Sequence, residues 1–144
     1  MLVQQILKAK DTEGVFTVKP EVSISEVTQI LREKRIGGVV VSSDGEAAEG
    51  ILSERDIVRA LASRGEGLME LTAANLMTKH PICCSLEMNS DEVLTKMTEG
   101  RFRHMPVVEG GAMVGLITLG DVVKYRLEEL AMEKDALEGM IMGF

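Results

Sequence analysis

The sequence contains two copies of one motif, and this duplication constrains the fold more than any other feature. Residues 50–58 read Gly-Ile-Leu-Ser-Glu-Arg-Asp-Ile-Val, and residues 115–123 read Gly-Leu-Ile-Thr-Leu-Gly-Asp-Val-Val. Upstream segments align at a separation of 66 residues, for example Thr17-Val18 with Cys83-Cys84 and Glu26-Val27 with Glu92-Val93. Self-similarity at this period predicts two copies of one supersecondary unit.

Local signals predict the order β-α-β-β-α within each copy. The first copy has expected strands at 16–18, 39–41 and 49–52. A capping box at Ser23 and Glu26 begins its first helix, and Ser53 begins its second, with Ile57, Val58 and Leu61 on the inner face. The second copy has expected strands at 82–85, 105–108 and 113–117, a helix capped by Asn89 and a helix from Thr118. Short helices at 2–7 and 73–77 precede the two copies.

These elements define an α+β fold in which helices cover one face of a small sheet in each copy. We expect a first repeat with its leading helix at 1–64, a linker at 65–72 and a second repeat at 73–127. A C-terminal helical extension occupies 128–144. Its apolar seam consists of Val123, Leu127, Leu130, Lys134, Leu137 and Ile141. This seam either packs against a partner subunit or covers the chain's own sheet.

Composition excludes several classes of protein. A net charge of −7 argues against a nucleic-acid binder, because duplex binding depends on Lys and Arg. Ten Met and only four aromatic residues, three Phe and one Tyr, predict an aliphatic, Met-rich core. The adjacent Cys83 and Cys84 suit neither a disulfide framework nor a metal site, so we interpret them as buried thiols. No secretory signal or membrane-spanning run is apparent, which predicts a soluble, cytoplasmic protein.

The two strand-to-helix junctions carry the functional signal. Ser53 with Asp56, and Thr118 with Asp121, have the spacing of an ordinary helix cap, which is the simplest interpretation. The same junction also suits a nucleotide, because free amides at a helix N-terminus bind anions and a nearby carboxylate accepts ribose hydroxyls. Nearby cations are Arg55, Arg103 and His104, either as phosphate ligands or as solvated side chains.

Catalysis has little support in the sequence. It contains no Ser-His-Asp set, no metal-ligand cluster and no phosphate-binding Gly-x-x-x-x-Gly-Lys loop. Binding a ground-state nucleotide gives no turnover by itself. We therefore expect a sensor without a cofactor rather than an enzyme.

On these motifs the chain resembles a tandem pair of CBS domains, known as a Bateman module. The resemblance rests on 50–56, 115–121 and the segment Arg101-Phe-Arg-His-Met-Pro-Val-Val108, and it covers about residues 2 to 127. It implies two repeats packed about a pseudo-twofold axis, with two clefts that bind adenosine-containing ligands. By this resemblance the residues of the first cleft are Asp121, Thr118, Arg103, His104, Thr17, Ile36 and Gly37. Those of the second are Asp56, Ser53, Arg55, Gly38, Cys83 and Phe102.

Departures from the family pattern predict unequal clefts. Val40 stands where the second copy has Pro106, and Gly37-Gly38 replace larger polar residues. Gly120 replaces the equivalent of Arg55, so the Asp121 cleft lacks that guanidinium. We expect the Asp121 cleft to be the occupied one. Two or three local cations favour AMP over longer phosphate chains, with ATP, ADP, NAD and S-adenosylmethionine as alternatives.

The sequence thus predicts a regulatory module that senses an adenine nucleotide and reports it through the packing of a homodimer or of a regulated protein partner. The main alternative is a structural or interaction module with vestigial clefts, in which the acidic terminal helix is the active surface.

Overall fold

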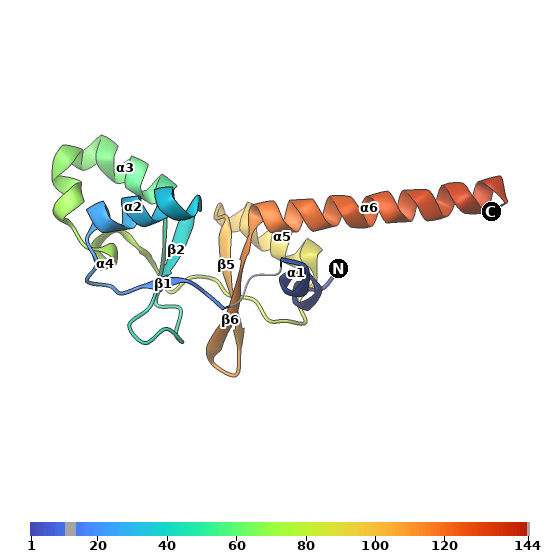
Figure 1. Ribbon diagram of the computed structural model, residues 1–144, viewed down its shortest axis with the longest axis horizontal. Coiled ribbons are helices and arrows are strands. Elements are labelled where there is room, and N and C mark those ends of the chain that lie inside the picture. The colour runs from blue at the N-terminus through green and yellow to red at the C-terminus, as the bar shows by residue number, and fades with distance from the viewer. Residues whose placement is uncertain (11–13, 144) are drawn as a thin grey trace.

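The computed structural model describes residues 1–10 and 14–143 (Figure 1). The first copy comprises β1 (Thr17–Val18), α2 (Ile24–Lys34), β2 (Gly38–Val41), β3 (Gly50–Ser53) and α3 (Glu54–Arg64). The second comprises α5 (Ser90–Gly100), β5 (His104–Glu109), β6 (Ala112–Thr118) and α6 (Leu119–Met142). The remaining elements are α1 (Val3–Lys10), the 3-10 helix η1 (Gly65–Glu70), α4 (Ala73–Leu76) and β4 (Thr78–Lys79). The predicted α+β class and the duplicated unit are confirmed.

The two copies form separate sheets with related pairing. In the first sheet the strand order is β1-β2-β3-β4, with β1 parallel to β2 and the other pairs antiparallel. In the second sheet β5 and β6 pair antiparallel. The strand predicted at 82–85 is wrong, because only Cys84 bridges β5, at Val107. Extending that parallel ladder toward residue 82 would require an N–H from Pro106, which proline lacks.

The leading helix of each copy packs on the core of the other copy. Val3 and Ile6 of α1 are fully buried in the second core, and the N–H of Val3 donates to the carbonyl of Met88 at 2.8 Å. Ala73 of α4 is buried in the first core, and its N–H donates to the carbonyl of Val22 at 2.8 Å. Strand β4, which follows α4, also pairs with β3 of the first copy. Each repeat therefore contributes its leading helix to the core of the other repeat, a reciprocal exchange of α1 and α4.

This exchange explains the glycine that begins each repeated motif. A Cβ on Gly50 would lie 2.4 Å from Sδ of Met77, and a Cβ on Gly115 would lie 2.7 Å from Cδ2 of Leu7. Met77 directly follows α4 and Leu7 lies in α1, so each motif glycine accommodates the end of the exchanged helix.

Gly50→Ala is expected to lower the free energy of unfolding by about 1–3 kcal/mol, because the new methyl group overpacks the site held by Met77. Chemical denaturation followed by circular dichroism measures this loss. Gly67→Ala, where no atom lies within 4 Å of the new Cβ, is the control and should leave stability unchanged. Adding Met77→Ala to Gly50→Ala should recover part of the loss; an unchanged deficit would contradict the packing explanation.

Two expectations about side chains need correction, and the linker contains a short helix. On α3 the buried residues are Ile57 and Ala60, whereas Val58 and Leu61 are exposed. The expected linker at 65–72 contains η1, whose Leu68 is fully buried in the first core. At the start of α2, Ser23 Oγ accepts from the N–H of Glu26, but the described bonds include no return bond from the Glu26 side chain.

Helix α6 extends far beyond the second repeat, as Figure 1 shows. Its buried residues, Val122 and Tyr125, lie in its first turns. The apolar seam that begins at Val123 therefore does not cover the chain's own sheet within the described residues. Its apolar side chains are exposed.

Candidate functional site

Both repeated junctions form reciprocal helix caps. The N–H and Oγ of Ser53 donate to Oδ2 of Asp56 at 2.9 and 3.0 Å, and the N–H of Asp56 donates to Ser53 Oγ at 3.4 Å. The N–H of Thr118 donates to Oδ2 of Asp121 at 2.9 Å, and the N–H of Asp121 donates to Thr118 Oγ1 at 3.1 Å. The simple interpretation as caps is thus correct at both junctions. It does not exclude a ligand, because the cap bonds that each carboxylate accepts end on Oδ2 rather than Oδ1.

Among the residues that the structure describes, Asp121 carries an ion pair and Asp56 does not. The Nζ of Lys10, at the end of α1, lies 2.7 Å from Oδ2 of Asp121 and also donates to the carbonyl of Leu116 at 2.8 Å. The Lys10 and Asp121 side chains are only 17% and 19% exposed. The exchanged leading helix thus supplies a cation to one junction, which makes the two junctions chemically unequal.

A single continuous cleft of about 1280 Å³ opens beside both junctions. Ten of the residues expected at the two clefts line it: Ile36, Gly37, Gly38, Ser53, Arg55, Asp56, Phe102, Arg103, His104 and Thr118. Asp121, Thr17 and Cys83 are not among its lining residues. Thr17 lies in β1 opposite Val40, and the thiol of Cys83 donates to the carbonyl of Pro81 at 3.4 Å. The structure therefore brings the two expected clefts together into one.

His104 lines this cleft and lies against the backbone of its counterpart in the other copy, Gly38. Gly38 and His104 are equivalent at the separation of 66, and a Cβ on Gly38 would lie 2.9 Å from Cε1 of His104. A side chain and its symmetry equivalent cannot occupy the same space near a twofold axis. The second copy can therefore carry an imidazole at this position only because the first copy has Gly38, which lacks a side chain. This explains why Gly38 departs from the family pattern.

Burial lowers the pKa of His104 from its ordinary value of 6.5, while the charges of Glu54 and Asp56 oppose that shift. The imidazole is therefore neutral at pH 7. Since the unfolded chain binds the proton more tightly than the folded one, this group contributes stability above about pH 6.5. That contribution is lost as the pH falls through the lower pKa of the folded state.

We expect the free energy of unfolding to fall between pH 6.5 and 5, and His104→Gln to flatten that part of the profile. Urea titrations at half-unit intervals of pH measure the slope. Parallel profiles for the two proteins would contradict the assignment.

The cleft is cationic although the chain is acidic. Its lining includes six of the 16 Lys and Arg residues, namely Lys10, Arg35, Arg55, Arg59, Arg101 and Arg103, but only two of the 23 acidic residues, Glu54 and Asp56. The cleft that holds both expected sites thus contains more cations than the Arg55, Arg103 and His104 expected from the sequence. A cleft with such an excess of one charge concentrates anionic ligands.

Four of these cations, Lys10, Arg35, Arg59 and Arg101, were missed in the sequence. A signal for two of them existed, because Arg35 and Arg101 align at the separation of 66. Each ends its helix in the left-handed region, at φ 54° for Arg35 and 56° for Arg101. Lys10 had no such signal, since it reaches the cleft only through the exchange of leading helices.

Cys84 is buried as expected, whereas Cys83 is only partly buried. Burial raises the pKa of Cys84 to about 12, with the neighbouring Cys83 adding to the shift, and burial also raises the pKa of Cys83. Both thiols therefore stay protonated near neutral pH, consistent with a packing role. Within residues 1–10 and 14–143, no three His, Cys, Asp or Glu side chains are placed to hold a metal ion. No helix in that part of the chain has the length and apolar character needed to cross a membrane.

Comparison with known proteins gives a consistent set of similarities. A curated relative is the CBS domain-containing protein CBSCBSPB1 of Arabidopsis thaliana, 32% identical over 137 residues. The match covers 94% of this chain but only 25% of the relative, so the chain spans about a quarter of that protein. A similar solved structure is the CBS-domain containing protein ATU1752 from Agrobacterium tumefaciens, with a TM-score of 0.83 and 40% identity, covering 88% of this chain and 99% of that one.

Two similar structures hold adenosine-containing ligands. The CBS domain protein PAE2072 from Pyrobaculum aerophilum, complexed with AMP, has a TM-score of 0.75 and 26% identity, covering 92% of this chain and 99% of that one. The CBS domain pair of protein MJ0100, in complex with 5-methylthioadenosine and S-adenosyl-L-methionine, has a TM-score of 0.77 and 25% identity, covering 90% and 98%.

The family model described as "CBS domain" matches residues 6–63 and 73–128, which is most of the chain. Each match contains one of the two capped junctions beside the cationic cleft. With its two repeats and its exchanged leading helices, the chain belongs to the CBS-domain family, as a tandem CBS pair.

Proposed function

We propose that this CBS pair is a regulatory module that binds an adenine nucleotide in the cleft between its repeats. The observation that carries the proposal is the cationic cleft of about 1280 Å³ that lies beside both repeated junctions. Family membership adds support, because two solved relatives hold AMP or S-adenosylmethionine.

The chemistry of the junctions suits a nucleoside. The cap bonds occupy Oδ2 of Asp56, so Oδ1 remains available to accept ribose hydroxyls. Ser53 and Thr118 line the cleft at the N-termini of α3 and α6, where free amides and the helix dipole attract an anion. The arginines of the cleft are suited to phosphate oxygens, because a guanidinium donates several hydrogen bonds in one plane.

AMP is our first candidate ligand, with ATP, ADP, NAD and S-adenosylmethionine as alternatives. Six lining cations match a triphosphate at least as well as a monophosphate, so charge alone does not favour AMP. The support for AMP is the AMP complex of the similar protein from Pyrobaculum aerophilum. The cap at Asp56, which carries no ion pair among the described residues, is the better ribose site, in place of the Asp121 site first expected.

Calorimetric titration with these five ligands tests the proposal. Arg103→Ala is expected to weaken the phosphate-bearing ligands about ten- to a hundredfold, because a hydrogen bond to a charged group contributes about 1.5–3 kcal/mol. S-adenosylmethionine, which lacks phosphate, should be much less affected. Arg64→Ala, at the exposed end of α3 and outside the cleft lining, is the matched control. If no ligand binds more tightly than about 1 mM, the proposal fails.

The alternative function is an interaction module whose active surface is the exposed part of α6. Removing the residues after Leu130 separates the two functions. A nucleotide sensor keeps its ligand affinity after this truncation, whereas an interaction module loses its partner. We also propose a homodimer, because the equivalent residues Val58 and Val123 are both exposed on the second helices of the two repeats.

A further inference from the structure

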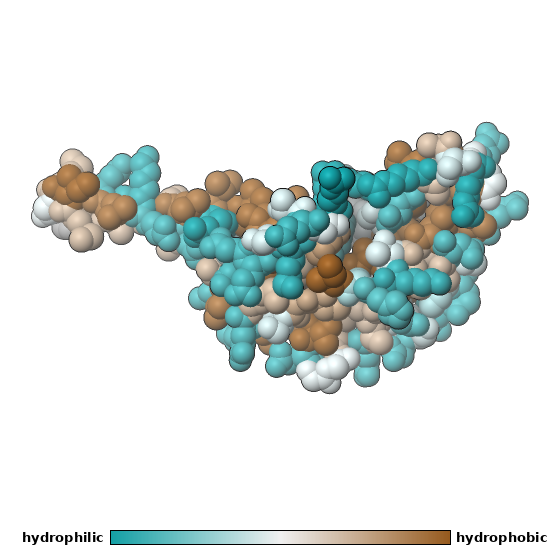
Figure 2. Space-filling model, turned by 180° about the vertical axis from the view of Figure 1, so that it is seen from behind, coloured by the Kyte–Doolittle hydropathy of each residue, from teal (hydrophilic) through white to brown (hydrophobic). Residues whose placement is uncertain are grey.

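Helix α6 has an exposed apolar seam along its whole length. The seam residues recur at alternating spacings of four and three residues, which places them on one face of the helix. Their exposed fractions are 43% for Val123, 61% for Leu127, 43% for Leu130, 59% for Leu137 and 85% for Ile141. Lys134 is the one polar residue of the seam. Figure 2 shows apolar side chains along the projecting helix and at its tip.

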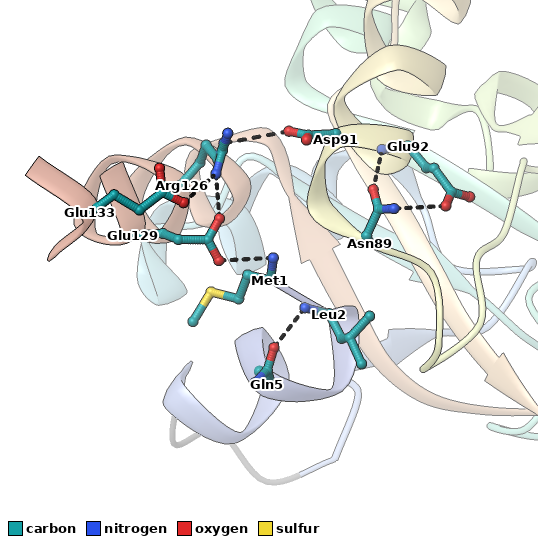
Figure 3. A network of polar contacts seen from close by, with 9 residues as sticks. All are labelled: Met1, Leu2, Gln5, Asn89, Asp91, Glu92, Arg126, Glu129 and Glu133. Atoms are coloured by element: carbon teal, nitrogen blue, oxygen red, sulfur yellow. Dashed lines mark hydrogen bonds and ion pairs between the residues drawn. The ribbon is translucent and has the colours of Figure 1, made fainter. Parts of the chain in front are cut away.

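Apart from the pair of Lys134 with Glu138, whose Nζ and Oε1 lie 3.8 Å apart on the same helix, the chain's own ion pairs occupy a different part of α6. Arg126 contacts Asp91 of α5 at 3.4 Å and also pairs with Glu129, while the amino group of Met1 lies 2.9 Å from Glu129 (Figure 3). Glu133 lies 4.0 Å from Arg126 on the same side. These ion pairs hold the base of α6 against the second repeat and leave the seam uncovered.

The charges in and beside the seam distinguish a parallel from an antiparallel arrangement of two copies of α6. If a second copy packed in parallel and in register, Lys134 would face Lys134 of the partner subunit. In that arrangement Glu133 would also lie beside Glu138 of the partner subunit, so two acidic contacts would be repulsive. Parallel pairing is therefore disfavoured by like charges in the seam and beside it.

Antiparallel pairing centred on Met132 separates the two Lys134 side chains and removes both Glu133–Glu138 contacts, leaving one like-charge contact, between Glu133 and Glu133 of the partner subunit. It sets Val123 against Ile141, Leu127 against Leu137, and Leu130 against Lys134 of the partner subunit. Lys124 and Glu138 each directly follow a seam residue, and antiparallel helices bring such positions together. Each dimer then contains two Lys124–Glu138 contacts of opposite charge, and the single Lys134 fixes the register.

We propose that the seam of α6 binds α6 of a second copy of this chain in this antiparallel register. The arrangement gives the proposed homodimer a specific interface, which runs from Val123 in the second repeat along the C-terminal extension. It also involves the cleft, because Val123 belongs both to the seam and to the cleft lining.

Charge exchange in the full chain tests the register. Lys124→Glu and Glu138→Lys are each expected to weaken the dimer about tenfold in sedimentation equilibrium, because each turns two attractive contacts into repulsive ones. The double variant should recover the dimer. Within one helix the two residues are about 21 Å apart, at 1.5 Å per residue, so recovery requires contact between subunits. Asp135→Lys, which makes the same change of charge away from the seam, is the matched control and should leave the dimer unchanged.

Leu137→Asp tests the seam itself. Because Leu137 is 59% exposed, its replacement should leave the helical signal of the fold intact and yield a monomer at 20 μM. A monomeric parent chain, a dimer that survives Leu137→Asp, or a double charge variant no tighter than its single variants would each overturn the proposal. Nucleotide binding by such a monomer would leave the proposed function standing, so the two failures are distinguishable.

Discussion

Gly38→Val is expected to lower the free energy of unfolding by about 1–3 kcal/mol and to weaken nucleotide binding at least tenfold. Any Cβ at this position would lie 2.9 to 3.2 Å from three atoms of the His104 ring, and valine adds two further methyl groups. Gly38 is also the ladder partner of Ser53, so a displaced β2 shifts the cap of α3. Denaturant titration measures the stability, and calorimetry with AMP measures the binding.

The neighbouring glycine provides the control. A Cβ on Gly37 would lie 3.5 Å or more from its nearest atoms, which is ordinary van der Waals contact, so Gly37→Ala should be tolerated. Combining Gly38→Ala with His104→Ala should restore the stability that Gly38→Ala alone removes. If Gly38→Val proved as stable as the parent chain, the close packing of glycine on imidazole would be refuted.

Asp121→Ala is expected to destabilise the fold more than Asp56→Ala, although the two residues occupy equivalent positions. Both substitutions remove a helix cap, at about 0.5–2 kcal/mol. Asp121→Ala also leaves the largely buried ammonium of Lys10 without its carboxylate, which adds about 1–3 kcal/mol. The difference between the two free energies of unfolding measures the ion pair.

A double-mutant cycle isolates this interaction. Lys10→Met should be destabilising in the parent chain but nearly neutral in the Asp121→Ala background. Lys8→Met, in the exposed part of α1, controls for the loss of charge. Additive effects of Lys10→Met and Asp121→Ala would show that the pair contributes nothing. Because Asp121→Ala perturbs the fold, Asp56→Ala is the better variant for testing the role of a cap carboxylate in ligand binding.

The sequence was sufficient for whatever the duplication encodes locally. The order of elements and the caps at Ser53 and Thr118 follow from a pattern that occurs twice in register, and the family resemblance supplied ten of the residues that line the cleft. The sequence was insufficient for contacts between the two repeats. The ion pair of Lys10 with Asp121 depends on which core α1 joins, and a periodic pattern of apolar residues does not contain that choice.

Two other errors have the same physical origin. The expected strand at 82–85 is only a bridge at Cys84, because the bond that would extend it requires an N–H from Pro106, a residue more than 20 positions away. Val58 and Leu61 were assigned to the core because apolar residues at helical spacing usually face inward. They are exposed in the single chain, and an inward face cannot be distinguished from a surface for another subunit by periodicity alone.

The reciprocal exchange of α1 and α4 has a consequence for how such a protein can be divided or can arise. Cutting the chain between the repeats would give two fragments, each carrying a helix that belongs to its neighbour and missing the one that closes its own core. A gene for one repeat alone would therefore encode a polypeptide that completes its fold only by trading helices with an identical molecule. Fusion of two such genes would turn that association between molecules into a permanent one within a single chain.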